Sequence, residues 1–419
     1  MVNGLFYSCL FLIWGMLLYH MFLMLGSVFH YLQGKKLIKK WKKVKLRSLP
    51  TVSVLVPAHN EEVVIEDTIK AMLKLRYPKD KLEIIIINDN SSDGTGAIAD
   101  RYARRYPFLK VLHTRPPHAG KGKSGALNQG YNMSSGEIVV VYDADNTPEP
   151  DAVTYLVMGL VNDQKAGAMV GKFRVINAHQ SLLTRFINIE TITFQWLAQA
   201  GRWFWFKLST IPGTNFAIRR SILEELGGWD EKALSEDTEL SIRVYNLGYH
   251  IRFFPAAITW EQEPETWRVW WKQRTRWARG NQYVIAKYIF SFMKLKRKRV
   301  FLDLFYFLFT YFLFLFSVLV SDVIFVMNFA FDFNLAIGPV SLALLVLAFL
   351  LYVTEVLVAL SIERGQLTVK NALIVMLMYF TYSQVWIALV VYSLYLETKR
   401  VLLKQESKWY KTERYKKAS

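Results

Sequence analysis

Hydrophobic positions in this chain form two kinds of segment. The first kind is a long apolar run, and four are present, at roughly residues 5–31, 301–330, 336–362 and 372–396. About 20 apolar residues cross the hydrocarbon core of a bilayer, so each run is long enough to span it. The first run has neither a basic leader nor a small-residue cleavage site, which predicts a retained anchor and not a cleaved signal peptide.

The second kind of segment lies between the first two long runs. Short, continuously apolar stretches alternate there with helical ones, which predicts a parallel α/β sheet covered on both faces. Ligands bind such sheets at the carboxyl ends of the strands, where this chain carries "HNEE", "NDNSSDG" and "DAD". The expected strands are 51–58, 82–89, 109–114 and 137–145, and the expected helices are about 61–75, 95–106 and 124–133.

The charges suggest how the chain is oriented. Basic stretches at 34–48 and 294–299 flank the α/β segment, and basic loops beside spans mark the cytoplasmic side of a membrane. We therefore expect a multi-pass membrane protein whose α/β segment is cytoplasmic. The expected divisions are an anchor (1–33), a basic linker (34–50), the α/β domain (51–264), amphipathic interfacial helices (265–300), a bundle of about three spans (301–396) and a basic tail (397–419).

Composition narrows the possible partners. The net charge of +18 is accounted for by topology and contact with anionic lipid, so nucleic acid is not an expected partner. The single cysteine, Cys9, excludes a disulfide framework and a cysteine-based zinc site. Four spans would place the basic tail outside the cell. Either one C-terminal segment is interfacial or re-entrant, or the charge bias is overruled, and both alternatives stay open.

Three aspartates follow the second and fourth expected strands. Asp143 and Asp145 lie two apart at the end of a buried strand, where paired carboxylates suit Mg²⁺ or Mn²⁺. The alternative is a turn, since Asp-Asn-Thr-Pro is good turn chemistry. Asp89 ends the second strand, where it can accept hydrogen bonds from a nucleoside, or can simply belong to a loop.

The stretch "ALSEDTELSIRV" places Glu236 beside Asp237 near the start of an expected helix. Acids at that place stabilise a helix N-terminus, which is one interpretation. In the other, Asp237 is a general base that removes a proton from an attacking hydroxyl.

The stretch "WKQRTRWARGN" combines cations and indole rings just before the chain becomes apolar. Gln273, Arg276 and Trp277 can share one face of a helix, where the arginine neutralises a leaving diphosphate and the indole stacks on a sugar ring. The alternative is a helix on the lipid surface with snorkelling arginines.

Together these residues resemble the processive, membrane-embedded enzymes of glycosyltransferase family 2, which make poly-N-acetylglucosamine, hyaluronan, chitin and cellulose. The resemblance covers about residues 52–281 and rests on an Asp after the second strand, Asp-x-Asp, Glu-Asp and Gln-x-x-Arg-Trp. "VPAHNEE" and "GKSGALNQG" also look like the family. The cellulose-type Phe-Phe-Cys-Gly-Ser motif is absent and no soluble domain follows the last span, so the layout is closest to the biofilm poly-N-acetylglucosamine synthases.

The resemblance implies a GT-A fold that binds a UDP-sugar and a divalent metal, Mg²⁺ or Mn²⁺. It implies that Asp237, with Glu236, is catalytic and that Asp145 and Asp143 hold the metal. The residues it implies for the nucleotide sugar are Asp89, Asp143, Lys123, Arg276 and Glu61. Those it implies for the acceptor are Gln273, Trp277, Gly213 and Thr214.

The function expected from this resemblance is an inverting, processive polysaccharide synthase. It would move sugar, expected to be N-acetylglucosamine, from a UDP-sugar donor onto a growing β-linked exopolysaccharide and translocate the product across the membrane. Beyond donor, acceptor chain and bilayer, a small accessory membrane subunit is a candidate partner. A non-processive transferase acting on a lipid carrier is the alternative enzyme, and an inactive scaffold or transporter subunit is the alternative class. Glu355, in the middle of a span, is expected to face the polymer path or to bond a neighbouring helix.

Overall fold

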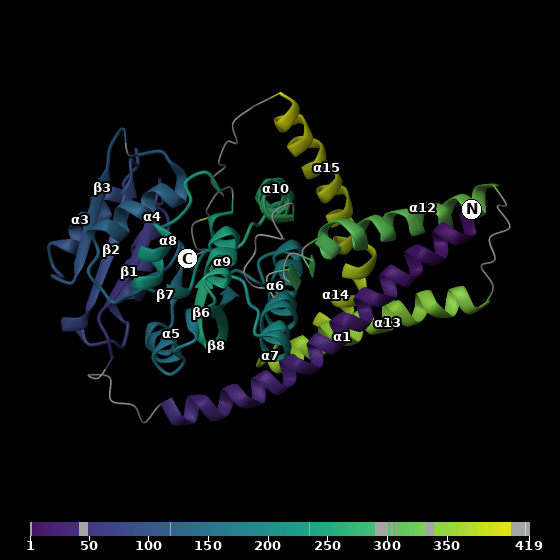
Figure 1. Cartoon of the computed structure of the whole chain (residues 1–419), viewed down its shortest axis with the longest axis horizontal. Coiled ribbons are helices and arrows are strands. Elements are labelled where there is room, and N and C mark those ends of the chain that lie inside the picture. Colours follow the sequence, from purple (N-terminus) through teal and green to yellow (C-terminus); the bar gives the residue numbers. More distant parts are fainter. Residues whose placement is uncertain are drawn as a thin grey trace.

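A computed structural model describes residues 2–41, 49–117, 119–233, 235–289, 301–302, 305–306, 308–331, 339–403 and 415. A sheet covered by helices occupies one end of the molecule, and long apolar helices extend from the other (Figure 1). Parts of the expected linker, interfacial helices, bundle and tail lie outside the described residues, at 42–48, 290–300, 303–304, 307, 332–338, 404–414 and 416–419.

The sheet has eight strands in the order β3-β2-β1-β4-β7-β6-β8-β5. The four expected strands are its β1 to β4, and all of them pair in parallel, as predicted. The strands are β1 (Val52–Ala58), β2 (Leu82–Asp89), β3 (Leu109–Thr114), β4 (Ile138–Val141), β5 (Thr147–Pro148), β6 (Ala166–Val175), β7 (Phe216–Arg219) and β8 (His250–Glu261).

The other half of the sheet adds antiparallel strands to the expected parallel, Rossmann-like α/β sheet, although β6 and β8 pair in parallel. Strand β7 is antiparallel to both β4 and β6, and β5 is antiparallel to β8. The result is a mixed, parallel-rich sheet of the GT-A type. Four strands were not predicted: β5 and β7 are only two and four residues long, whereas β6 and β8, with 10 and 12 residues, were missed although they are long.

Strand β4 ends four residues earlier than expected, at Val141. The backbone N–H of Asp143 donates to the Thr214 hydroxyl (3.0 Å), and the N–H of Asn146 turns back to the Asp143 carbonyl (3.1 Å). Asp143 and Asp145 therefore lie in a turn beyond the strand, held by a side chain from another loop.

Helices cover both faces of the sheet, because alternate strand residues point to opposite sides and nearly all are apolar. Val54 and Val56 pack against α2, α3 and α5, whereas Leu55 joins the core on the side of α4 and α6. The helical elements of this domain are α2 (Ile65–Leu73), η2 (Lys79–Lys81), α3 (Thr95–Ala103), α4 (Gly122–Met133), α5 (Ala152–Val161), α6 (Leu182–Phe194), the π-helical η3 (Gln195–Gly201), α7 (Arg202–Phe206), α8 (Arg220–Leu226), α9 (Glu236–Asn246) and α10 (Trp267–Ile289).

The remaining described helices are mostly apolar: α1 (Val2–Trp41), η5 (Phe309–Phe314), α12 (Leu315–Phe331), α13 (Pro339–Ile362), α14 (Val369–Phe380) and α15 (Tyr382–Leu402). Three helical segments within the described residues are long and apolar enough to cross a membrane, namely Asn3–Trp41, Ala343–Ile362 and Val369–Leu402. The last bends at Thr381, between α14 and α15. The described apolar part of the remaining expected span, Phe312–Ile324, is shorter than a span requires.

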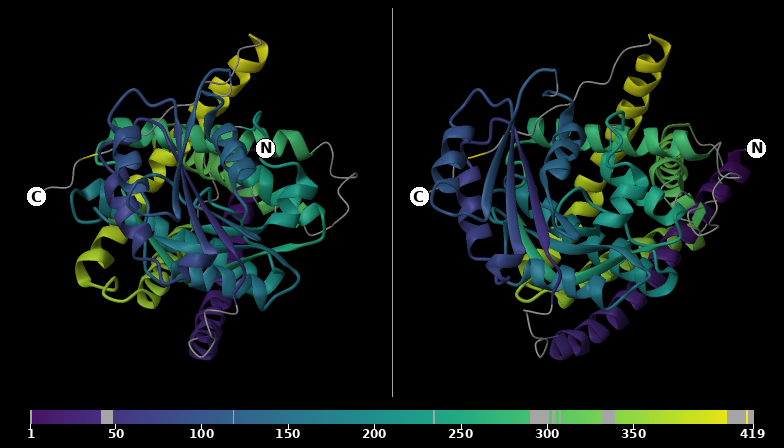
Figure 2. Two further views of the ribbon diagram at one scale, coloured as in Figure 1. Left: turned by 90° about the vertical axis from the view of Figure 1, so that its left-hand side faces the viewer. Right: turned by 60° about the vertical axis from the view of Figure 1, so that its left-hand side comes forward.

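One hydrophobic core joins the sheet to the apolar helices. Leu23 of α1 and Leu360 of α13 belong to the same cluster of buried residues as Leu55 of β1. Helix α1 packs against η3 and α7 and runs along α12 and α13 (Figures 1 and 2). It is helical through Trp41, so it includes the first part of the expected linker. On α13, Glu355 is buried 3.8 Å from His20 of α1.

Candidate active site

The loops after β1 and β2 are joined beside Asp89. The carboxylate of Asp89 is buried and accepts hydrogen bonds from the Thr114 hydroxyl (2.5 Å) and from the backbone N–H of Gly120 (3.3 Å). Glu61 is also buried, and its backbone N–H donates to the Thr95 hydroxyl (2.7 Å). Asp89 thus lies at the strand end expected from sequence, fixed in place by the end of β3 and the loop that follows it.

Lys123 connects the Asp-x-Asp turn to the Glu-Asp pair. It lies in the first turn of α4, with its ammonium 2.5 Å from Asp143 and 3.7 Å from Glu236. Burial alone would lower the pKa of Lys123, but the surrounding carboxylates of Asp143, Glu236 and Asp237 raise it well above its usual range. The lysine is therefore a fixed cation, placed where a phosphate can reach it.

Gly213 and Thr214 complete this cluster from the loop before β7. The carbonyl of Gly213 accepts a hydrogen bond from the Lys123 ammonium (2.9 Å), and its φ of +84° is one that glycine adopts without strain. A Cβ atom at Gly213 would lie 3.0 Å from Asp237 Oδ2, so the backbone passes close to that carboxylate. The Thr214 hydroxyl donates to Asn146 Oδ1 (2.7 Å), beside Asp145.

Asp237 lies half-buried in the first turn of α9, at the helix start that the sequence predicted. One carboxylate oxygen accepts the backbone N–H of Thr238 (2.6 Å). Burial and the neighbouring charge of Glu236 raise the pKa of Asp237, while the cations of Lys123 and Arg276 and the Thr238 N–H oppose that rise. A carboxylate with a raised pKa is a better proton acceptor, which is what a general base requires.

Glu239 fixes α9 against α10. Its buried carboxylate accepts hydrogen bonds from Lys287 (3.0 Å) and Tyr288 (2.9 Å) of α10 and from Arg243 (2.7 Å) of α9 itself. Where the helices cross, Gly280 leaves room for Ser235, since a Cβ there would overlap the serine hydroxyl. The helix with Asp237 is therefore held rigidly beside the helix with Arg276.

Helix α10 presents the Gln-x-x-Arg-Trp residues in different environments. Gln273 is buried, Arg276 is half-buried and close enough to Asp237 to lower its pKa, and Trp277 is 38% exposed. One connected cluster thus contains six of the expected site residues: Lys123, Asp143, Gly213, Thr214, Glu236 and Asp237. Arg276 lies close enough to Asp237 for their charges to interact. Gln273 and Trp277 lie on the same helix as Arg276.

Sequence reasoning missed three charged residues behind this motif: Arg274, Glu190 and Glu263. Arg274 is buried, 2.9 Å from Glu190 of α6 and 3.9 Å from Glu263 in the loop after β8. An acid inside the apolar stretch "FINIETITF" was a usable signal for Glu190, because a charge on a buried helix needs a partner.

The carboxylates of Asp143 and Asp145 fit a hard divalent cation, since both are oxygen ligands on one turn and neither is fully buried. No group of three or more acidic, histidine or cysteine side chains within the described residues is placed to hold a metal. The remaining ligands of such an ion would therefore be water and substrate oxygens, the arrangement that Mg²⁺ favours.

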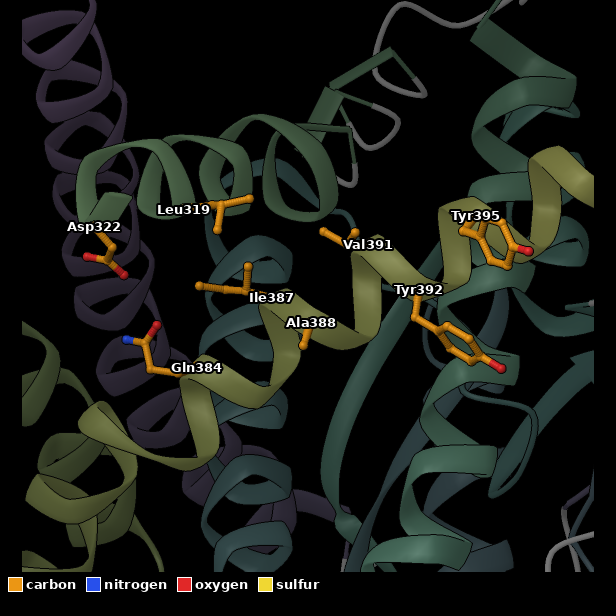
Figure 3. A pocket seen from close by; sticks show the side chains of 8 residues that line it. All are labelled: Leu319, Asp322, Gln384, Ile387, Ala388, Val391, Tyr392 and Tyr395. Atoms are coloured by element: carbon orange, nitrogen blue, oxygen red, sulfur yellow. The ribbon is translucent and has the colours of Figure 1, made fainter. Parts of the chain in front are cut away.

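A groove of about 660 Å³ lies along the apolar helices, between α12 and α15 (Figure 3). Asp322 and Gln384 line one end and Tyr392 and Tyr395 the other, with apolar side chains between them. The ring of Tyr392 lies 5.8 Å from that of Trp271 on α10. The groove thus runs from the middle of the apolar helices towards the helix that carries the site.

Comparisons with known proteins agree with this geometry. The family model described as "Glycosyltransferase like family 2" matches residues 50–280. A "Probable glycosyltransferase YdaM" of Bacillus subtilis (strain 168) is 65% identical over 415 residues, which is 99% of each chain. A poly-beta-1,6-N-acetyl-D-glucosamine synthase of Staphylococcus aureus (strain COL) is 32% identical over 282 residues, 67% of each chain.

A solved structure shares the fold. It is the mannosyltransferase PcManGT from Pyrobaculum calidifontis, in complex with GDP-Man and Mn²⁺, which is 20% identical with a TM-score of 0.60. The match covers 95% of this chain and 99% of that one. At 20% identity the structural likeness establishes only the GT-A-like fold. The family and the enzyme class are established by the sequence matches. The chain is a glycosyltransferase and belongs to family 2.

Proposed function

We propose that this protein is an inverting, processive polysaccharide synthase that transfers N-acetylglucosamine from UDP-N-acetylglucosamine to a growing β-linked chain. The observation that carries the proposal is the joining of Asp143, Lys123, Glu236 and Asp237 in one partly buried cluster. The choice of donor is supported by the 32% identity to a poly-beta-1,6-N-acetyl-D-glucosamine synthase.

In this proposal the donor lies across the carboxyl ends of β2 and β4. Asp89 binds the uridine, with Glu61 beside it in the loop after β1. Lys123 and Arg276 bind the diphosphate as cations. Gly213, with its positive φ, lets the backbone approach the sugar end of the donor closely.

The transfer step is a single displacement. The acceptor hydroxyl oxygen bonds to the anomeric carbon as the bond from that carbon to the diphosphate oxygen breaks. The electron pair leaves with UDP, and the hydroxyl proton passes to the Asp237 carboxylate. Lys123 and Arg276 stabilise the negative charge that develops on the departing diphosphate.

The Asp143–Asp145 turn suits a divalent cation, and the Mn²⁺ in the mannosyltransferase with the same fold supports that assignment. Bound there, Mg²⁺ or Mn²⁺ would neutralise charge on the diphosphate as a Lewis acid. Asp143 is paired with Lys123 at 2.5 Å, so Asp143 would exchange the lysine for the cation, and the Lys123 ammonium would then be available to the donor phosphate.

The acceptor chain is proposed to lie along α10, with Trp277 stacking on a sugar ring, Gln273 bonding its hydroxyls and Thr214 at the edge of the site. The proposed location is a bacterial plasma membrane, and the hydrophobic core shared by the sheet and the apolar helices supports it because it ties the site to those helices. A cytoplasmic catalytic domain is proposed from the flanking basic stretches, and the product leaves through the bundle.

The test is synthesis by the purified protein in nanodiscs, with UDP-N-acetylglucosamine and Mg²⁺ or Mn²⁺. We expect UDP release and a high-molecular-weight, metal-dependent product, and neither in Asp237→Asn. Short products only, in the presence of a polyprenyl phosphate, would instead establish the lipid-carrier transferase. The groove between α12 and α15 favours that second candidate, since its apolar middle suits a lipid tail. No turnover with any UDP-sugar would refute both.

A further inference from the structure

We propose that Arg274 is a positioning residue that sets the plane of the Trp277 indole for the acceptor sugar. The proposal rests on the proposed function, because it assigns Trp277 to the acceptor. Arg274 and Trp277 are three residues apart on α10 and so share one side of the helix. The Arg274 guanidinium lies 4.0 Å from the centre of the indole ring, in cation–π contact.

Arg274 is itself held in place by ion pairs with residues outside α10. Its side chain is 1% exposed and makes an ion pair with Glu190 of α6 at 2.9 Å, with Glu263 at 3.9 Å. A guanidinium is planar and donates in fixed directions, so its carboxylate partner determines the orientation of the plane. Glu190 therefore orients the guanidinium, and the guanidinium orients the indole stacked on it.

The same network reaches the apolar helices. The Tyr382 hydroxyl, at the start of α15, donates to the same Glu190 oxygen (2.9 Å) and accepts the indole N–H of Trp270 (2.9 Å). Trp270 lies one turn before Arg274 on α10. A shift at the bend between α14 and α15 would thus be transmitted through Glu190 to the ring that grips the acceptor.

Covering one face of the indole has a consequence for the acceptor. The guanidinium occupies one side of the ring, while Trp277 remains 38% exposed. A pyranose can then stack only from the side turned away from Arg274. This restricts the acceptor sugar to one face of the indole and so narrows the directions in which its hydroxyls can approach Asp237. Without Arg274 the indole can rotate, so the acceptor hydroxyl is often misplaced. The donor does not contact the indole, so its binding is affected less.

The experiment compares Arg274→Met with Arg279→Met. Methionine keeps apolar packing on the indole but removes the charge and the ion pair. Arg279 is the matched control, since it also makes an ion pair from α10, to Glu397 of α15 at 3.2 Å, yet it is outside the acceptor contacts proposed above. Both proteins are assayed in nanodiscs with UDP-N-acetylglucosamine and a short N-acetylglucosamine oligosaccharide as acceptor.

We expect Arg274→Met to raise the acceptor KM about tenfold, because the indole loses its cation–π contact and the ordering that this contact provides. The donor KM should change less than about twofold. We also expect more UDP released by hydrolysis per sugar transferred. Tyr382→Phe removes one hydroxyl and leaves the ion pair intact. It should also raise the ratio of UDP released by hydrolysis to sugar transferred, but by less than Arg274→Met. Arg274→Lys should show the same raised acceptor KM and hydrolysis ratio as Arg274→Met, because an ammonium is not planar and cannot orient the indole.

Two results would overturn the inference. One is an acceptor KM and a hydrolysis ratio in Arg274→Met equal to those in Arg279→Met, and the other is full rescue by Arg274→Lys. If Arg274→Met does not fold, Tyr382→Phe decides, since an unchanged ratio there removes the proposed relay. The proposed function fails separately, if the unmodified protein neither extends the oligosaccharide nor makes polymer.

Discussion

Two charge clusters in this molecule are built with opposite signs. In the site, the ammonium of Lys123 lies among the carboxylates of Asp143, Glu236 and Asp237. Just after the end of α13, the carboxylate of Glu363 lies between Lys172 and Arg174 of β6. The first cluster has an excess of acid, and the second an excess of base.

The two clusters also differ in how completely they are closed. The Glu363 carboxylate is 4% exposed and has a third donor, the Trp196 indole N–H at 2.9 Å. The Asp143 carboxylate is 32% exposed, and its surplus negative charge is available to a cation. A closed cluster fixes two parts of a fold together, whereas an open one can exchange partners. The difference separates a structural joint from a site of chemistry.

Asp237→Asn should have the largest effect on transfer. The amide cannot accept the acceptor proton, so we expect kcat to fall by about 10³-fold, within the usual range for loss of a general base. UDP formation and sugar incorporation measure it. Asp230→Asn is the control, because Asp230 pairs with Lys287 outside the cluster (2.9 Å). Near-normal incorporation by Asp237→Asn would remove Asp237 from the reaction.

Lys123→Met should break the open cluster by removing its cation. We expect kcat/KM for the donor to fall about 100-fold, because a diphosphate loses a fixed positive charge. Lys121→Met is the matched control. Lys121 precedes Lys123 by two residues and pairs with the exposed Glu231 (3.4 Å) instead of with the cluster. Equal kinetics in the two variants would contradict the role of Lys123.

The pH profile of the same variant sharpens the point. The pKa of Asp237 is raised by burial and by Glu236, so activity that needs its carboxylate is lost as pH falls through that raised value. Lys123 opposes the rise, and its removal should move the acid limb of kcat/KM to higher pH by about one unit. An acid limb that stays in place would mean that another group controls it.

Gly213→Ala should have a smaller effect. An alanine at φ +84° is strained, and its Cβ would lie 3.0 Å from Asp237 Oδ2 and 3.4 Å from the Lys123 ammonium. We expect kcat to fall about tenfold, the equivalent of about 1.4 kcal/mol. Gly227→Ala has a similar φ of +71° but nothing within 4 Å of its Cβ, so it isolates strain from contact. Equal losses in both variants would refute the contact.

Glu363→Gln should break the closed cluster and change transfer least. Lys172 and Arg174 would lose their carboxylate, which typically costs about 3–5 kcal/mol of stability for a buried pair. We expect a lower thermal midpoint in detergent, while kcat per folded molecule stays within about twofold. The reverse pattern, normal stability with lost transfer, would make this cluster part of the chemistry.

The sequence predicted the parts of the molecule whose signals are local. Strands β1 to β4 were found because continuous apolar runs such as "LEIIIIND" are typical of strands buried on both faces. The places of Asp143 after a buried strand and of Asp237 at a helix start were readable from the local pattern, whereas Lys123, Gly213 and Thr214 were implied only by the resemblance to the family. Strand β7, with four residues, and the Arg274–Glu190 pair, 84 positions apart, depend on contacts that no local pattern reports. Their positions follow from tertiary packing alone.

Helix α1 has a consequence for how the protein is made. Its 40 residues would be about 60 Å long, and it packs against α12 and α13, which are encoded about 300 residues later. At about 5–20 residues per second, a ribosome needs on the order of 15–60 s to synthesise that interval. Throughout that interval, His20 of the proposed anchor is without Glu355, the residue it lies beside in the folded protein. The order of synthesis therefore adds a constraint on α1 that its contacts in the folded protein do not reveal.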